Sequence, residues 1–346
     1  MTIGLTLTSI WLTTTVVTWL LTPAVIKLYR HFGWDKPHRG YRQSVKDTHH
    51  NLVPRGGGLA IFGGLLVGAA IFLAWDQTIM AIILASLLLA VTGMCDDIYD
   101  ISPWVRLIVN ILTAVLMVMV GVRIDFVTNP FGGVLLLTQW SWLPIGLTII
   151  YIVALTNITN WAKGIDGQMP GMVAIAATWI GILALRLTAS LNVTAMLSLI
   201  VAGCFTGFLW WNFYPQKIMP GYGGGSLAGF LLAVISILAG AKIATLFMVL
   251  ALPIADAIFT ILRRMIAGKS VFLGDRGHLH HKLLDRLHWG RRRIAIFYWL
   301  VTLVMGAAAL VLPTWGKIGA FLLVVAMVFW FLIEVKLQSL ADKKEK

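Results

Sequence analysis

The chain has 346 residues, of which 59% are hydrophobic and 12% charged, and it carries a formal net charge of +13. Soluble domains contain roughly 45–50% apolar and about 25% charged residues, so this composition excludes an ordinary soluble globular protein. The apolar residues come in blocks about as long as a bilayer is thick, which predicts an all-α, polytopic membrane protein. The basic residues cluster in a few loops beside these blocks, where membrane orientation and anionic headgroups account for them. We therefore expect no nucleic-acid partner.

About eleven apolar runs, with ten as the alternative count, have the length and composition of membrane helices. The first run lacks the positive n-region of a cleaved signal, so we interpret it as a membrane helix. The break between the eighth and ninth runs is the least distinct. The runs lie near residues 5–28, 57–75, 78–95, 104–121, 141–158, 169–187, 191–211, 226–240, 242–262, 294–312 and 315–336.

Lys and Arg concentrate after the first run, after the ninth run and in the C-terminal tail. Short cytoplasmic loops carry an excess of these residues, and under the eleven-span count all three regions fall on one side. We therefore expect the N-terminus outside and the C-terminus in the cytoplasm. Between the fourth and fifth runs, residues 124–139 alternate β-prone side chains around Asn-Pro and Gly-Gly, which predicts a short β-hairpin on the outer face.

Polar residues suited to chemistry gather in five segments on the predicted cytoplasmic side, although such residues are costly at membrane depth. The chain contains no linker long enough to separate a soluble domain. We therefore expect a single membrane domain over residues 1–346, with active-site loops near 29–56, 95–103, 157–170, 212–226 and 263–293.

The strongest local signal is the pair Asp96 and Asp97, at the end of the third apolar run. Adjacent carboxylates suit a hard divalent cation and allow the roles of ligand and base to be divided. The alternative is a solvated acidic helix end. We favour the functional pair because it adjoins an apolar run in a chain that is poor in acidic residues.

A second polar segment follows the fifth run. Asn157 and Asn160 are three residues apart and share a helix face, and the turn at 164–167 presents Asp166. Their amide and carboxylate groups suit a metal, a phosphate or a sugar, and helix capping followed by a turn is an equal alternative. The glycine-rich segment at 221–226 suits backbone binding of a phosphate, or simply lets the chain turn.

Three histidines and an arginine stand close together in the C-terminal basic loop: Arg276, His278, His280 and His281. This mixture of cations and hydrogen-bond donors favours a phosphate or pyrophosphate site. A zinc site is less favoured because no Cys is near to complete it, and a solvated amphipathic loop is the remaining alternative. In the first basic loop, His49 and Arg55 suit the same anion or an anionic lipid headgroup.

Several motifs follow one another along the chain: Asp35-x-Pro37, His49 followed by VPRGGG, Asp96-Asp97, Asn157-x-x-Asn160 leading into GIDG, NFYPQK, Pro253-x-x-Asp256, Arg263-Arg264 and DRGHLHH. In this order they resemble the polyprenyl-phosphate N-acetylhexosamine-1-phosphate transferases, of the glycosyltransferase family 4 type. The resemblance covers nearly the whole chain. The DRGHLHH segment is more similar to the branch that transfers N-acetylglucosamine-1-phosphate than to the pentapeptide branch.

The resemblance implies transfer of a sugar-1-phosphate from a UDP-sugar to a polyprenyl phosphate at the cytoplasmic face of the cell membrane, with release of UMP and with Mg²⁺ or Mn²⁺ as cofactor. It leaves open the sugar, the polyprenol length and the envelope glycan served, such as O-antigen or teichoic acid, while the apolar faces of the spans suit a homodimer. The implied catalytic residues and metal ligands are Asp96, Asp97 and Asp166. The implied substrate-binding residues are His49, Arg55, Asn157, Asn160, Lys163, Asp256, Arg276, His278, His280 and His281.

Two positions depart from the family pattern. Lys163 stands where the family has the first Asp of Asn-x-x-Asn-x-x-Asp-Gly-x-Asp-Gly, and Tyr222 stands where the family has the metal-binding Asp of Gly-Asp-x-Gly. A lysine partly substitutes for a divalent cation against phosphates, but an ammonium does not coordinate several oxygens as a metal does. The alternative function is therefore a non-catalytic or metal-independent relative that binds or transports polyprenyl phosphate or a nucleotide-sugar.

Overall fold

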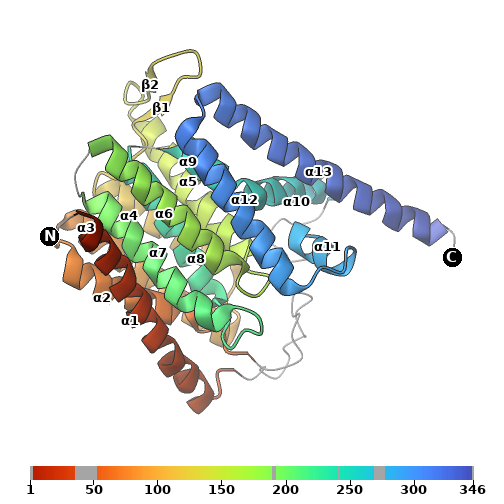
Figure 1. Cartoon of the computed structure of the whole chain (residues 1–346), viewed down its shortest axis with the longest axis horizontal. Helices are drawn as coiled ribbons and strands as arrows, with labels where there is room; N and C mark the ends of the chain where they lie inside the picture. The colour runs from red at the N-terminus through yellow and green to blue at the C-terminus, as the bar shows by residue number, and fades with distance from the viewer. Residues whose placement is uncertain (1–2, 36–52, 189–191, 241, 269–276, 345–346) are drawn as a thin grey trace.

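The computed structural model describes residues 3–35, 53–188, 192–240, 242–268 and 277–344, which form a bundle of helices (Figure 1). The helices are α1 (Ile3–His31), α2 (Gly57–Phe72), α3 (Gln77–Tyr99), α4 (Pro103–Met119), α5 (Trp142–Trp161), α6 (Gln168–Thr188), α7 (Val193–Asn212), α8 (Gly221–Leu238), α9 (Ile243–Val249), α10 (Ala251–Ile266), α11 (Leu279–Asp285), α12 (Arg291–Val311) and α13 (Thr314–Lys344). The strands are β1 (Phe126–Thr128) and β2 (Val134–Leu136).

Eight of the described helices are long and apolar enough to cross a membrane, and the number rises to nine if the bent pair α9 and α10 forms one span. Two further apolar helices, α2 and α4, are shorter. Many large apolar side chains remain exposed on the outside of the bundle, including Leu323 and Trp330 on α13. The chain is therefore a multi-pass membrane protein.

The apolar run at 242–262 was expected to form a single helix, but the structure divides it into two helices. Helix α9 ends at Val249, α10 begins at Ala251, and the two axes are bent by 84°. Pro253 gives the physical reason: it has no N–H to donate to the carbonyl four residues earlier, and its ring crowds the preceding turn. Because of this bend, α10, which carries Asp256, runs nearly perpendicular to α9.

Helix α8 lies in the middle of the bundle, behind α6 and α7 in Figure 1, and is buried along almost its whole length. It packs against α2, α3, α5, α6, α7 and α9, as expected for a helix that is apolar on every side. Glycines allow the close approach, because a Cβ on Gly93 would collide with the backbone of Gly223 and a Cβ on Gly58 would lie 2.7 Å from the nitrogen of Gly224. This packing sets the N-terminus of α8 beside the end of α3.

Capping residues fix the ends of α3 and the start of α4. The Asp76 side chain accepts a hydrogen bond from the Ile79 N–H and begins α3, and Asp100 ends it in the left-handed conformation with φ of 50°. Helix α4 begins at Pro103, after the N-cap Ser102. Asp96 and Asp97 thus lie in the last turn of α3, directly before α4 turns back.

The hairpin prediction is confirmed, because β1 and β2 pair in antiparallel register. Phe131 at its tip packs against Trp315, at the start of α13. At the other end of α12, Arg291 donates a hydrogen bond to Asp166. The hairpin and the turn that carries Asp166 therefore lie at opposite ends of the bundle.

Candidate active site

The acidic pair of α3 is surrounded by positive groups. The Arg106 side chain, on α4, donates to both carboxylate oxygens of Asp96 at 3.0 and 3.2 Å. Asp97 accepts a hydrogen bond from the backbone N–H of Tyr222 at 3.2 Å, and the charges of Lys163 and Arg55 attract it. The Asp96 side chain is only 10% exposed, so this is not the environment of a solvated helix end.

Lys163 extends from the turn after α5 to the start of α8. Its Nζ donates to the carbonyl oxygen of Gly221 at 2.7 Å and lies 5.8 Å from the centre of the Tyr222 ring. Gly221 has φ of +67°, and a Cβ there would collide with the Arg55 carbonyl and the Asp97 carboxylate. Glycine is therefore required at this position for the α8 N-terminus to reach Asp97.

The Tyr222 side chain fills the space between α4 and α8. Its hydroxyl donates to Oδ1 of Asn110 at 3.1 Å, and the Arg106 guanidinium lies 5.4 Å from the centre of its ring. Arg106 and Lys163 both approach this ring, a cation–π arrangement that lowers the cost of placing two positive charges near each other. Tyr222 is thus part of the site rather than an unrelated replacement.

The predicted histidine site is assembled by α10 and α11. Asp256 on α10 accepts hydrogen bonds from the Leu279 N–H at 2.7 Å and contacts Nδ1 of His278 at 2.8 Å. His278 and His280 stack with their ring centres 5.7 Å apart. All three histidines are buried, so the solvated-loop alternative is wrong. His280 packs against Gly164, one residue from Lys163.

Asp166 is buried and holds two distant segments together. It accepts hydrogen bonds from the Gln216 N–H at 3.2 Å and from the Arg291 side chain at 3.3 Å. Asn212 supports the same turn, because its Oδ1 accepts from the Gly167 N–H at 3.0 Å. The contacts of Asp166 thus differ from those of the acidic pair.

The remaining predicted residues have varied positions. Asn157 donates to the Val153 carbonyl of its own helix at 2.8 Å. Asn160 packs against Gly225, and its Oδ1 has no hydrogen-bond partner within the described ranges. His49 and Arg276 lie outside the described residues.

The expected metal ligands do not form one cluster in the described part of the chain. No group of three or more His, Cys, Asp or Glu side chains there is arranged to hold a metal ion. Asp96 and Asp97 instead contact Arg106, Lys163 and the backbone of α8. This donor set does not fit a divalent cation, because Mg²⁺ favours several oxygen ligands and is repelled by adjacent cations.

Sequence reasoning missed three residues that complete the site: Arg106, Asn110 and Arg291. Arg106 is the one ionisable residue inside α4, and a charge in an apolar helix is itself a signal of function. Asn110 lies four residues later, on the same face. Arg291 lies among the basic residues that follow the ninth apolar run, and its sequence position gives no indication that it reaches Asp166.

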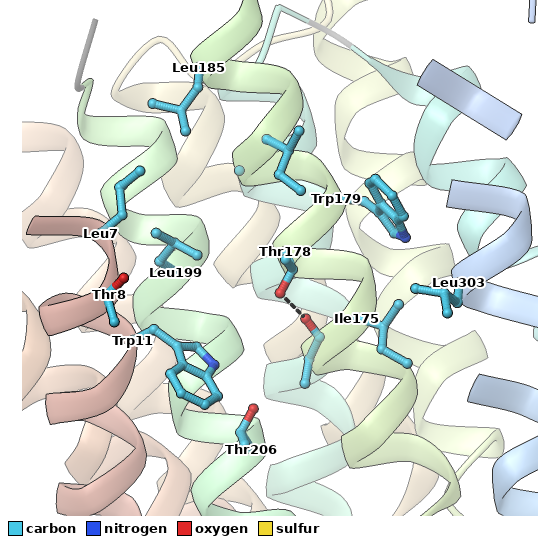
Figure 2. Close-up of a pocket in the computed structure, with 13 residues that line it drawn as sticks. Leu7, Thr8, Trp11, Ile175, Thr178, Trp179, Leu185, Leu199, Thr206 and Leu303 are labelled. Atoms are coloured by element: carbon cyan, nitrogen blue, oxygen red, sulfur yellow. Dashed lines mark hydrogen bonds between the residues drawn. The ribbon is translucent and has the colours of Figure 1, made fainter. Parts of the chain in front are cut away.

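A separate cavity of about 630 Å³ lies between α1, α6 and α7 (Figure 2). Trp11, Thr178 and Thr206 face it from these helices, and Leu303 adds a wall from α12. None of its lining residues is charged, and none belongs to the predicted site. It offers an apolar surface but no group for phosphate chemistry.

Comparison with known proteins identifies the family. Residues 79–240 match the model of glycosyl transferase family 4. A probable undecaprenyl-phosphate N-acetylglucosaminyl 1-phosphate transferase of Bacillus subtilis is 30% identical over 341 residues, which cover 94% of this chain and 90% of that protein. The chain belongs to glycosyl transferase family 4.

Other relatives match this chain with similar sequence identity. The decaprenyl-phosphate N-acetylglucosaminephosphotransferase of Mycobacterium leprae is 30% identical, over 80% of this chain and 78% of that protein. The phospho-N-acetylmuramoyl-pentapeptide-transferase of Halalkalibacterium halodurans is 27% identical, over 87% of this chain and 95% of that protein. The similarity thus extends well beyond the 79–240 match and includes both branches considered from the sequence.

Proposed function

We propose that this chain transfers a sugar-1-phosphate, N-acetylglucosamine-1-phosphate in the first instance, from a UDP-sugar to a membrane polyprenyl phosphate and releases UMP. The names of the bacterial relatives support this reaction. The observation that carries this proposal is that the turn after α5 joins two groups of polar residues. Lys163 in this turn reaches the start of α8 beside Asp97, and the neighbouring Gly164 contacts His280. Groups suited to two anionic substrates thus meet at one place.

In the proposed reaction, an oxygen of the lipid phosphate forms a bond to the β-phosphorus of the UDP-sugar. The bond from that phosphorus to the oxygen of the UMP leaving group breaks. Negative charge collects on the departing phosphate, and fixed positive groups stabilise it. Lys163, His280 and Arg55 are our candidates for this role, and the partly described loops supply His49 and Arg276 as further substrate-binding candidates.

The two acids of α3 have separate proposed roles. Asp97 lies beside Lys163 and orients its ammonium, and it accepts the proton of any lipid phosphate that arrives protonated. Asp96 holds Arg106 in place. Asp166 and Asn160 shape the turn that carries Lys163, and Asp256 orients His278. In this proposal Mg²⁺ and Mn²⁺ have no role, because the described side chains do not fit such an ion.

The proposal includes a topology of eleven spans. Counting the bent pair as one span and adding the shorter helices α2 and α4 to the eight long ones gives this number. A 16-residue helix such as α2 rises about 24 Å, which is slightly less than the ~30 Å of the hydrocarbon core. The N-terminus would then lie outside, and the site and C-terminus in the cytoplasm. That the protein forms a homodimer, and that its product enters an envelope glycan such as O-antigen or teichoic acid, remain predictions.

The test is release of UMP by the purified full-length protein in detergent, given UDP-N-acetylglucosamine and undecaprenyl phosphate. We expect Asp97→Asn to lower the rate by about 100-fold or more, the scale expected for loss of a charged group at the reacting centre. The matched control is Asp125→Asn, near the hairpin, where Arg123 lies 3.9 Å away. Lipid or nucleotide binding without UMP release from any UDP-sugar would instead favour the non-catalytic relative.

A further inference from the structure

The acidic pair of α3 carries its own counter-charges. Its two carboxylates, Asp96 and Asp97, face the two side-chain cations Arg106 and Lys163. Arg55 adds a third positive charge that acts on Asp97. The negative charge that would otherwise attract a metal ion is thus already balanced by side chains.

The placement of Lys163 is specific. The Gly221 carbonyl accepts from its Nζ, and the N–H of the same peptide group, which belongs to Tyr222, donates to Asp97. The ammonium and the carboxylate therefore bind the carbonyl and the N–H of one peptide group at the start of α8. The N-terminus of α8 adds its own partial positive charge at this point, beside the charges of Lys163 and Arg55 that act on Asp97.

Tyr222, held by Asn110, occupies the position at which the family pattern has a metal-binding Asp. The Tyr222 ring is buried, with its hydroxyl on Asn110 and the two cations near its face. A divalent ion in this space would meet an aromatic ring and an ammonium in place of carboxylate oxygens. Such surroundings contradict the oxygen-rich octahedral shell that Mg²⁺ requires.

We propose that Lys163 takes the place of an active-site divalent cation in this chain, which makes it a metal-independent sugar-1-phosphate transferase. The Gly221 carbonyl holds the ammonium near Asp97, and the ammonium binds the pyrophosphate oxygens of the UDP-sugar directly. The lysine stays protonated while the bond to the lipid phosphate forms and the bond to UMP breaks. This inference rests on the proposed function for its substrate.

The first test measures metal binding without any turnover. Mn²⁺ is titrated into the purified full-length protein and the free ion is followed by electron paramagnetic resonance. We expect no saturable Mn²⁺ site in the natural chain and one saturable site in the double variant Lys163→Asp with Tyr222→Asp, because two carboxylates replace a cation and a ring. One tight Mn²⁺ site in the natural protein that Asp97→Asn removes would overturn the inference.

Lys217→Asp is the matched control for charge. Lys217 is exposed, and its Nζ lies 5.0 Å from the centre of the Trp211 ring. The substitution lowers the net charge by two units, as Lys163→Asp does by itself, whereas the double variant lowers it by three. It leaves the acidic pair intact. We expect it to leave Mn²⁺ binding unchanged. If it produces the same gain as the double variant, the gain reflects overall charge and the inference fails.

The second test uses UMP release with EDTA and then with added Mg²⁺. We expect the natural chain to keep its rate within about 2-fold in EDTA, and Lys163→Met to lose about 100-fold or more without rescue by Mg²⁺, as expected when a charge that stabilises the transition state is removed. Loss of the natural rate in EDTA with recovery in Mg²⁺ would overturn the inference. If no condition gives UMP, the proposed function fails, while the Mn²⁺ titration still decides whether this site binds a metal ion.

Discussion

The imidazole of His280 packs directly against the backbone of Gly164, at a distance that leaves no room for a Cβ atom on the glycine. This contact joins α11 to the turn that carries Lys163. The histidines and the lysine therefore depend on one another for their positions, although more than a hundred residues separate them in the chain.

Gly164→Ala is expected to separate these two parts of the site. The new methyl group displaces His280 and lowers the free energy of unfolding by about 1–3 kcal/mol, the usual cost of overpacking. The rate of UMP release falls by about 10- to 100-fold, because displacing a catalytic or binding group by about 1 Å is costly. The control is Gly146→Ala in α5, where a Cβ would meet nothing within 4 Å. Equal rates for the two variants would show that this contact does not matter for turnover.

Asp256→Ala is expected to raise the KM for the UDP-sugar. It removes the acceptor of the Leu279 N–H and the partner of His278, so the start of α11 loses its anchor. A buried donor left without a partner costs about 1–3 kcal/mol. The control is Asp76→Ala, at the start of α3 and away from the acidic pair. This variant loses a helix cap worth about 1 kcal/mol and should leave the KM for the UDP-sugar unchanged. A KM that stays constant in both variants would argue against an anion site at the histidines.

Gly93→Ala is expected to push α3 away from α8. Its methyl group meets the backbone of Gly223, which cannot turn aside. We expect a loss of about 1–3 kcal/mol in unfolding free energy, together with a weaker hydrogen bond from Tyr222 to Asp97 and a lower rate. At Gly63 the added Cβ meets only the end of the Leu21 side chain, at 2.8 Å. Since that side chain can rotate, Gly63→Ala should cost less, and a reversed order would contradict this packing argument.

A double-mutant cycle distinguishes two roles of Asp166. If it acts by holding Arg291, the variants Asp166→Asn and Arg291→Gln should couple by about 0.5–3 kcal/mol in unfolding free energy. The same coupling should be seen in the rate of UMP release. Arg292→Gln is the control, because Arg292 donates to the Tyr214 carbonyl instead. A large rate loss for Asp166→Asn alone, with Arg291→Gln nearly silent, would instead indicate that Asp166 contacts the substrate.

The sequence predicted the helical membrane class and the hairpin because each depends on local pattern. Hydrophobic run length predicts helices, and a motif order shared with a family indicates which loops meet. The bend at Leu250 was missed because the apolar run continues through it, and only Pro253 marked the break.

The partners of the acidic pair were harder to predict. That Arg106 pairs with Asp96 depends on how α4 turns back after Pro103, and that Arg291 reaches Asp166 depends on how α12 docks. Both are tertiary contacts between segments with no shared motif. Lys163 and Tyr222 were recognised as departures from the family, but their joint contact with Gly221 and the Asp97 carboxylate follows only from the packing of α3 on α8.

The central position of α8 also has a consequence for synthesis of the chain. Helices α2, α3, α5, α6 and α7, which pack against it, all precede it in the sequence, whereas its neighbour α9 follows it. When ribosomal synthesis has passed residue 240, the helix can therefore find nearly all its neighbours already in the bilayer. We expect the first 240 residues to assemble co-translationally, with α9 to α13 added afterwards to a preformed half-site that still lacks its histidines.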